Sequence, residues 1–202
     1  STMNDALANN FGIYLQEEFL INNFTIRGGI RYNRTDYKID QLQGNIPGST
    51  KQHWVNLLWS FGIKYRLSEY FDIFTNTSNS FTPPGLKSSG GTIPLSSLNV
   101  SGFTGQLPNP SLKAERGLSL DAGIDFMPLN NLMASGRFFY SSITDAIIEI
   151  LISQNPSQTM SVNADGETKV LGFEFSLKHQ IDNSMNWFGN FTFNNSKITN
   201  PD

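Results

Sequence analysis

Cysteine is absent from the 202 residues. This absence excludes a disulfide framework, a thiolate zinc site and a cysteine nucleophile, and it leaves the redox compartment open. Charge is also scarce, because Asp, Glu, Lys and Arg make up only 15% of the chain, against about 25% in an average soluble domain. The net charge is −3, so the basic surface typical of a nucleic-acid-binding protein is missing.

Long apolar runs are missing as well. No stretch approaches the roughly 18 consecutive apolar residues of a transmembrane helix, and the most apolar stretch, 143–152, contains Asp145 and Glu149. The N-terminus has no basic region followed by an apolar segment, so we expect no signal peptide in this chain. Both ends resemble the interior of a longer protein, and we expect a fragment.

What the sequence has instead is alternation. Between Val55 and Tyr65, large apolar residues occupy every odd position, and most even positions are polar or small. A period of two predicts a strand with one apolar and one polar face. The same pattern recurs along the chain and predicts about eight strands, near 11–19, 24–33, 54–65, 70–81, 117–127, 131–152, 160–179 and 185–197.

The predicted connections differ in length in a regular way. The short ones are 20–23, 66–69, 128–130 and 180–184, and the long ones are 34–53, 82–116 and 153–159. Because short and long connections alternate, the tight turns fall at one end of an antiparallel up-and-down meander and the large loops at the other. Short turns at one end and long extracellular loops at the other are typical of an outer-membrane β-barrel. We therefore predict an all-β fold.

Aromatic residues flank every predicted short turn. They are Phe19, Phe24, Tyr65, Tyr70, Phe71, Phe126 and Trp187. Membrane barrels carry such residues as a girdle at the membrane interface. The alternative is that Phe and Tyr are simply good strand residues. Because all four turns are flanked, the girdle is favoured.

Charged residues indicate which strand face meets water. Arg27 and Arg31 share one face, and an Arg at the bilayer midplane costs roughly 2–4 kcal/mol, so we predict that they line the lumen. Asp121 and Asp125 share a face roughly 13 Å apart, too far for a glycosidase pair, and we predict that they also line the lumen. Glu17 lies among lipid-type residues, either near an interface or beside a bulge.

Asn109-Pro110-Ser111-Leu112-Lys113-Ala114-Glu115 resembles the N-P-x-L-K-P-E motif of TonB-dependent outer-membrane receptors, with Ala114 in place of the second Pro. The residues that match this structural motif are Asn109, Pro110, Leu112, Lys113 and Glu115. Three further segments resemble the same family in the same order: 14–18, 74–84, and Asp145-Ala146-Ile147 followed by Asn163 and 172–174. The family often has Arg where this chain has Thr82, so no role of that Arg is carried over.

The resemblance implies a segment of a 22-strand barrel with a plugged lumen. On this basis 1–202 is a C-terminal part of the barrel domain, and the plug domain, the signal peptide and the final strands are absent. The family takes up scarce nutrients, such as ferric siderophores, cobalamin, haem or glycans. The resemblance thus implies a receptor in the bacterial outer membrane, in contact with its lipid, that binds a small molecule or metal chelate. It implies TonB contact only through parts absent here, and no enzyme.

The long loop 82–116 is the expected place of ligand contact, because binding residues concentrate on loops held by a rigid scaffold. Lys87, Asn99 and Phe103 are candidate ligand contacts. The alternative is that the loop only covers the barrel mouth. His53 and His179 fall at opposite strand ends, so no metal site is expected, and no catalytic motif or cofactor site is found.

Two other functions remain open at this point. One is a small closed or porin-like outer-membrane barrel with a passive or structural role. The other is a soluble ligand-binding β-sandwich, in which the apolar faces would pack together. The transported substrate does not follow from the sequence.

Overall fold

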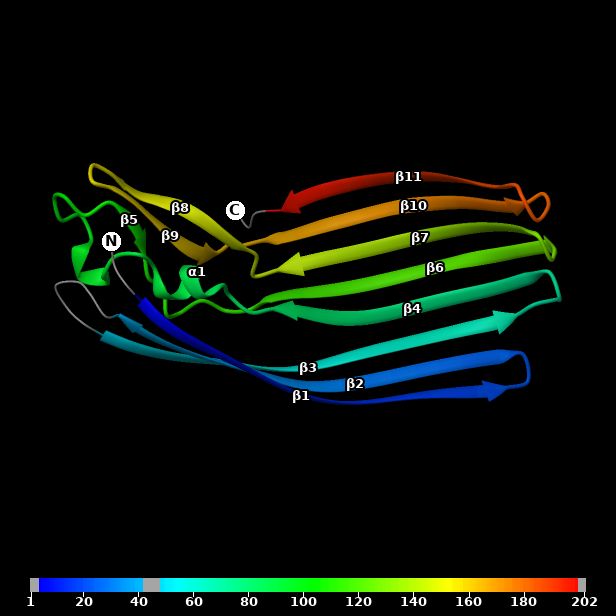
Figure 1. Ribbon diagram of the computed structural model, residues 1–202, viewed down its shortest axis with the longest axis horizontal. Helices are drawn as coiled ribbons and strands as arrows, with labels where there is room; N and C mark the ends of the chain where they lie inside the picture. Colours follow the sequence, from blue (N-terminus) through cyan, green and yellow to red (C-terminus); the bar gives the residue numbers. More distant parts are fainter. Residues whose placement is uncertain (1–3, 42–47, 200–202) are drawn as a thin grey trace.

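The computed structural model describes residues 4–41 and 48–199, and most of them lie in β-strands (Figure 1). Eight strands form one antiparallel sheet in the order β1-β2-β3-β4-β6-β7-β10-β11. Their bounds are β1 Asn4–Ile21, β2 Phe24–Gln41, β3 Gly48–Arg66, β4 Phe71–Thr82, β6 Glu115–Leu129, β7 Leu132–Thr144, β10 Glu167–Gln180 and β11 Asn186–Thr199. The predicted all-β meander of eight strands is confirmed.

A smaller sheet of three strands, in the order β5-β9-β8, lies at the loop end of the large sheet (Figure 1). Its strands are β5 Gly105–Leu107, β8 Ile147–Gln154 and β9 Ser157–Asn163, and the same end carries the short helices α1 Leu86–Gly90 and η1 Leu95–Ser97. The tight turns lie at the opposite end, as predicted (Figure 1). In the turn between β1 and β2, Asn22 has a φ of 53°, which Asn tolerates better than most residues.

Three predicted strand and loop boundaries are wrong at the loop end. β1 begins at Asn4 rather than near residue 11, and β2 and β3 extend far into the predicted loop 34–53. Of that loop, residues 42–47 lie outside the described part of the chain. The boundaries were missed because the outer side of these extensions is charged, so the apolar half of the alternation stops before the strands do.

The predicted sixth and seventh strands, 131–152 and 160–179, each combine two strands. β7 ends at Thr144, Asp145 has a φ of 56°, and β8 continues in the smaller sheet. The predicted long loop 153–159 is instead the tight turn of the β8–β9 hairpin and the start of β9. The kink expected at 142–145 is therefore a change of sheet.

The strand register separates the eight-stranded sheet into two faces. For example, Phe24, Ile26 and Ile30 lie opposite Tyr65, Ile63 and Trp59. We call this side the apolar face; its large residues include Ile13, Leu15, Phe19, Phe24, Ile26, Ile30, Leu57, Trp59, Phe61, Ile63, Phe71, Ile73, Leu118, Leu120, Ile124, Phe126, Phe138, Leu171, Phe173, Phe175, Phe191 and Phe193. Most of them are exposed. The opposite side is the polar face.

The buried apolar residues lie at the loop end of the molecule, where Ile39 belongs to the extended part of β2. The buried apolar side chains are Ile39, Ile93, Leu107, Leu112 and Ala114. No described segment covers the apolar face, whereas a β-sandwich would bury it. Within the described residues β1 pairs with β2 and not with β11, so the sheet is open rather than a small closed barrel.

Glu17 lies on the apolar face, opposite Gly28. The pairing of β1 with β2 runs from Asn4 to Ile21 without a register shift, so the bulge considered for Glu17 is not present. In the eight-stranded sheet the register shift falls between Phe126 and Leu129.

Candidate functional site

The segment 109–115 begins with a turn closed by its first residue. The Ser111 amide donates to Asn109 Oδ1 over 3.0 Å, a side-chain turn that Asn favours. The other end of the Asn109 carboxamide, Nδ2, donates to the carbonyl of Ser161 in β9 over 2.9 Å. Asn109 thus shapes its own turn and joins it to the smaller sheet.

The same segment is attached to the polar face of β3. Gln52 Nε2 donates to the Pro110 carbonyl over 2.7 Å, and Trp54 Nε1 donates to the Leu112 carbonyl over 3.1 Å. Leu112 itself is buried. The Trp54 ring contacts Tyr37 edge-on, with centroids 5.0 Å apart. The segment 109–112 therefore lies against the polar face at the loop end.

Asn163 holds three backbone groups at once. Its Oδ1 accepts from the Lys113 amide over 2.8 Å, and its Nδ2 donates to the carbonyls of Lys113 and Asp145 over 3.0 and 2.7 Å. Nearby, Glu115 Oε1 accepts from the Ile147 amide over 2.7 Å. The motif residues that lie apart in the sequence, at 109–115, 145–147 and 163, therefore meet at one place.

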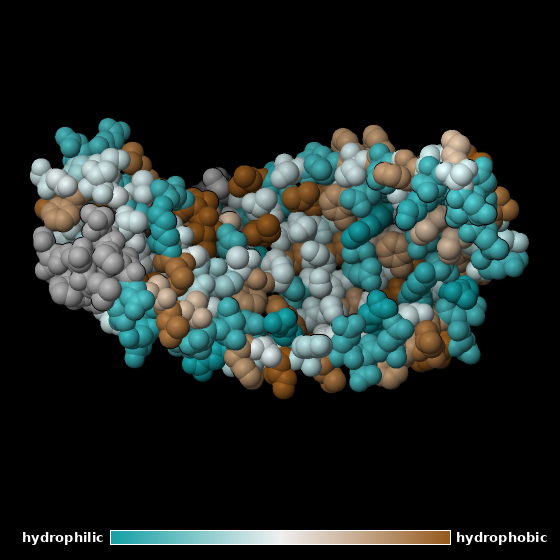
Figure 2. All heavy atoms as spheres, in the orientation of Figure 1, coloured by the Kyte–Doolittle hydropathy of each residue, from teal (hydrophilic) through white to brown (hydrophobic). Residues whose placement is uncertain are grey.

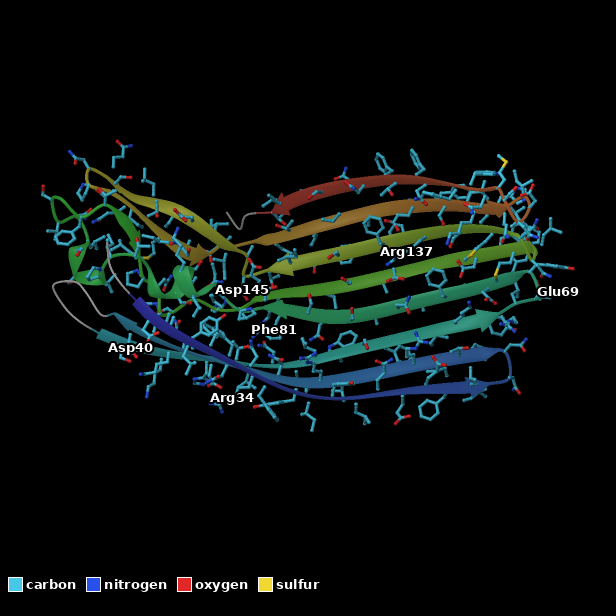
Figure 3. All side chains as sticks on the ribbon, in the orientation of Figure 1. Arg34, Asp40, Glu69, Phe81, Arg137 and Asp145 are labelled. Atoms are coloured by element: carbon cyan, nitrogen blue, oxygen red, sulfur yellow. The ribbon has the colours of Figure 1, made fainter. Side chains whose placement is uncertain are left out.

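The topology explains this convergence. β6 begins at Glu115, β7 ends at Thr144 and β10 begins at Glu167, and these three strands are neighbours in the sheet. Their loop ends lie together, and Asp145 is labelled there in Figure 3. Lys113 Nζ also lies 3.8 Å from Asp145 Oδ1. We call this cluster, Asn109 to Glu115 with Asp145, Ile147 and Asn163, the loop anchor.

The loop 82–116 is attached at a second point, to the side chain of Gln158 in β9. This side chain is fully buried. Its Oε1 accepts from the Asn99 amide over 2.8 Å, and its Nε2 donates to the carbonyls of Ser97 and Phe103, each over 2.7 Å. Gln158 thus fixes the path of residues 97–103. Its role depends on contacts across 55 or more positions, which the local sequence pattern does not reveal.

The candidate ligand contacts lie in this anchored loop. Lys87 is exposed on α1, Asn99 is exposed with a φ of 56°, and Phe103 is half-buried. Gln158 brings Asn99 and Phe103 together through their backbones, while Lys87 belongs to the separate helical turn.

The polar face carries paired charges towards the short turns. Arg27 pairs with Glu18, with Nε 2.9 Å from the carboxylate. Asp72, which is almost fully buried, pairs with Lys64 over 2.6 Å and with Arg66 over 3.5 Å. A buried carboxylate requires such partners.

A second group of charges continues across the sheet from β4 to β10. Arg137, labelled in Figure 3, lies 3.2 Å from Asp121 and 3.9 Å from Glu174. Asn76 Nδ2 donates to Asp121 over 2.9 Å, while Asp125 accepts from Ser135. Hydrophilic residues, in teal, are spread over much of the molecular surface in Figure 2.

The four sequence-predicted lumen residues, Arg27, Arg31, Asp121 and Asp125, all lie on the polar face. Arg31 differs from the others in that its Nη2 has a long hydrogen bond of 3.4 Å to Asn33 Oδ1. Arg31 also borders a shallow hollow of about 300 Å³, where the pairing of β3 with β4 ends at Ser60.

The model of the family described as TonB dependent receptor-like, beta-barrel, matches residues 1–202. The chain belongs to this family. No curated protein matches it at a significant level.

Solved structures of TonB-dependent receptors share its fold. The siderophore receptor PiuA of Acinetobacter baumannii is 20% identical, with a TM-score of 0.72 over 98% of this chain and 26% of PiuA. The ferric-catecholate import receptor Fiu of E. coli K12 is 19% identical, with a TM-score of 0.69 over 98% of this chain and 29% of Fiu. The FrpB iron transporter of Neisseria meningitidis is 20% identical, with a TM-score of 0.68 over 96% of this chain and 26% of FrpB. The chain spans less than a third of each.

Within this TonB-dependent receptor barrel, the described residues attach the loops and pair charges across the polar face. No group of three or more His, Cys, Asp or Glu in the described ranges could hold a metal ion. No described helix is long and apolar enough to cross a membrane. Sequence reasoning missed Gln52, Trp54 and Gln158 of the loop attachments, and found Asn163 only through the family motif.

Proposed function

We propose that this chain forms wall and extracellular loops of an outer-membrane receptor for energy-coupled uptake of a scarce nutrient. One observation carries the proposal. The apolar face extends over all eight strands and is exposed, while the opposite face carries paired charges. An exposed apolar face of this extent needs lipid or another apolar partner.

The height of the apolar face suits a membrane. On β2 it extends from Phe24 to Tyr32, after which Arg34 occupies the same side. Nine residues of strand span roughly 30 Å, which a barrel tilt of about 40° reduces to roughly 23 Å along the membrane normal. Barrel proteins have an apolar band about 25 Å tall. Phe24 and Tyr65, with ring centroids 4.6 Å apart, form part of the proposed girdle at the short-turn edge of the apolar face.

The polar face then lines the lumen of the barrel. Arg27, Arg31, Asp121 and Asp125 would border water or the plug of the complete receptor. Arg27, Asp121 and Asp125 have ion-pair partners on this face. A charge that faced lipid instead would cost roughly 2–4 kcal/mol at the midplane, which favours this placement.

The ligand would be captured from outside by the loop 82–116. Asn99 and Phe103, fixed by Gln158, and Lys87 on α1 are the proposed contacts. A ferric siderophore is the first candidate, since PiuA is a siderophore receptor and Fiu a ferric-catecholate import receptor. Cobalamin, haem and glycans are the other candidates. TonB would act through parts of the receptor outside this chain.

The test is uptake by cells that carry or lack the full-length gene. We expect deletion to abolish uptake of one metal chelate or vitamin, and loss of TonB to have the same effect. Alanine at Asn99 or Phe103 should lower ligand affinity without changing the amount of assembled receptor. Uptake that continues without TonB would instead support a passive barrel.

A further inference from the structure

The wall formed by the large sheet is interrupted between β3 and β4. The two strands pair as far as Ser60 opposite Ser78, and towards the loop end the pairing stops there. β4 continues beside β6 up to Thr82, whereas β3 continues beside β2 up to Gly48. Within the described residues, no backbone hydrogen bond joins this loop-side part of β3 to any segment other than β2. We call the interruption the seam.

One side chain spans the start of the seam. Asn79 of β4 accepts from the Trp59 amide through Oδ1 over 2.6 Å, and its Nδ2 donates to the Leu57 carbonyl over 3.0 Å. In a regular antiparallel pair these two groups of β3 would bind the backbone of β4. The carboxamide of Asn79 takes the place of that backbone and keeps the two strands apart. The wall is therefore closed at this level by a side chain, which can rotate.

The seam begins within the apolar face. Trp59 lies opposite Ile30, and Leu57 lies opposite Tyr32, where the apolar face of β2 ends. Both Leu57 and Trp59 are exposed. On the other side of the seam, Phe81 lies on the same face of β4 and is labelled in Figure 3 near the loop end of that strand. In the membrane placement proposed above, the seam meets the hydrocarbon layer near its loop-side edge.

The lumen side of the seam combines an apolar residue with a cation. Leu58 lies on the polar face, is half-buried and is directly opposite Arg31, which in turn is opposite Tyr14 of β1. Arg31 is exposed and has no carboxylate partner within the described residues. These three residues and Asn79 all border the hollow of about 300 Å³. Apolar and cationic groups are thus available side by side.

The closed seam also leaves a donor unused. Asn56 lies two positions from Leu58 on the polar face of β3, and its buried Nδ2 has no hydrogen-bond partner within the described residues. A buried donor without a partner costs free energy. A wider seam would lower that cost, because water or a ligand could then reach Nδ2.

We infer that the seam opens and accommodates the apolar chain of an amphiphile whose anionic head binds Arg31 in the lumen. The inference rests on the membrane placement proposed above. The chain would run from the head past Leu58 and leave between Leu57 and Phe81, so that each end of the amphiphile lies in its preferred surroundings. A guanidinium binds a carboxylate through charge-assisted hydrogen bonds. A hollow of about 300 Å³ lies at the small end of ligand pockets, and it suits a single chain rather than a bulky chelate.

The first experiment uses the full-length receptor in phosphatidylcholine vesicles. The probe is dodecanoate with a photoreactive group next to its carboxylate, and dodecanol with the same group is the uncharged comparison. We expect dodecanoate to label Leu58, which an amphiphile confined to the bilayer cannot reach because this side chain faces the lumen. Dodecanol should not label it. Equal labelling by both probes would overturn the inference, as would displacement of dodecanoate by millimolar acetate, which would show an anion site without a chain.

The head-binding role is tested by Arg31→Gln. This variant should weaken dodecanoate binding by roughly tenfold, the loss expected when one charge-assisted hydrogen bond is removed. The matched control is Arg27→Gln, which removes an arginine from the same strand and face, where Glu18 already occupies it. The control should retain dodecanoate binding. Equal weakening in the two variants would contradict the assignment of the head to Arg31.

A second experiment measures the opening itself. Spin labels at Val55→Cys in β3 and Arg116→Cys in β6 report the width across the seam, and labels at Ile63→Cys and Thr75→Cys, which lie opposite each other in the paired part, report the wall beside it. Asn79→Ala should widen the first distance and leave the second unchanged. Dodecanoate should widen the first distance in the receptor that retains Asn79, so this result does not depend on folding of the Asn79 variant.

The control for the seam is Asn76→Ala, which removes an Asn of the same strand that binds Asp121. It should change neither distance. An unchanged width in both Asn79→Ala and the dodecanoate-treated receptor would overturn the inference. Failure of the wild-type receptor to insert into vesicles would overturn the membrane placement as well, whereas insertion without carboxylate-dependent labelling of Leu58 would overturn only this inference.

Discussion

At the scale of single residues, carboxamide side chains hold the loops in place. Asn109, Gln158 and Asn163 each use both ends of the amide group to bind backbone groups, and each of them joins segments that are distant in the sequence. An amide can donate and accept at once, so it replaces a missing strand partner without adding charge. At these three positions an uncharged side chain therefore does work that a charged one could do only with a further partner.

Asn163→Ala should loosen the loop anchor. The change leaves the amide and carbonyl of Lys113 and the carbonyl of Asp145 without their partner. Each lost hydrogen bond costs about 1 kcal/mol, so we expect a loss of about 1–3 kcal/mol, measured as a lower unfolding temperature and faster proteolysis within 83–114. Asn194→Ala, on the polar face of β11, is the control and should change neither. Equal proteolysis in both variants would contradict the role of Asn163.

Gln158→Glu should release residues 97–103 more than Gln158→Met does. The carboxylate can still accept from the Asn99 amide, but it places a negative oxygen against the carbonyls of Ser97 and Phe103. Methionine has nearly the same shape and only loses the hydrogen bonds. Hydrogen exchange of the peptide 95–103 would measure the difference, and slower exchange in the Glu variant than in the Met variant would refute this account.

At the scale of elements, the β10–β11 hairpin depends on one carboxylate at its turn. Asp182 accepts from the Ser184 hydroxyl and amide and from the Met185 amide, over 2.7, 2.7 and 2.8 Å. Chiefly the Ser184 side chain, and then the two amides, lower the pKa of Asp182 below its ordinary 3.8. The carboxylate bound in this way favours the folded turn.

The turn should therefore lose stability in acid. Because the pKa of Asp182 is lower in the folded chain, its stabilisation is complete above the unfolded value near 3.8 and is lost as the pH falls through the lower folded value. The amide resonances of Ser184 and Met185 should shift in that range. Asp182→Asn should abolish the shift, and an identical titration in that variant would contradict the assignment.

The strands also show how far a local sequence pattern can predict the fold. Alternation predicts the central part of the strands of the large sheet, because one face is apolar there, as in Val55–Tyr65 and Leu118–Phe126. It fails at β7 and β8, since alternation continues through Asp145 although the chain changes sheets there. Period-two patterning reports that a residue is in a strand but not which strand pairs with it. The pairing of β5 with β9 is parallel and spans more than 50 positions, beyond any local pattern.

At the scale of the whole molecule, the two faces of the sheet should respond differently to charge. Phe173→Arg places a cation on the apolar face between Phe138 and Phe193, and it should destabilise the receptor in lipid vesicles by roughly 2–4 kcal/mol. Ser176→Arg, on the polar face of the same strand, should have a much smaller effect. Urea unfolding in vesicles measures both, and equal losses would refute the lipid placement.

The whole-molecule view also explains which site residues sequence could find. Alternation alone predicts that Arg27 shares a face with Arg31, and Asp121 with Asp125, because in a strand the face follows from position, and all four lie on the polar face. Their partners, such as Glu18 for Arg27 and Arg137 for Asp121, depend on register between strands. Gln158 was not selected, since its contacts join loop and hairpin across 55 to 61 positions.

The sequence alone determined the class of fold, the two-faced strands and the end at which the loops lie. These follow from alternation and turn residues, which act over a few positions. Only the tertiary structure decided that β8 and β9 leave the large sheet, and that the segments at 109–115, 145–147 and 163 form one anchor. These features depend on strand register and neighbour order, because hydrogen bonds between strands join residues that no local pattern connects.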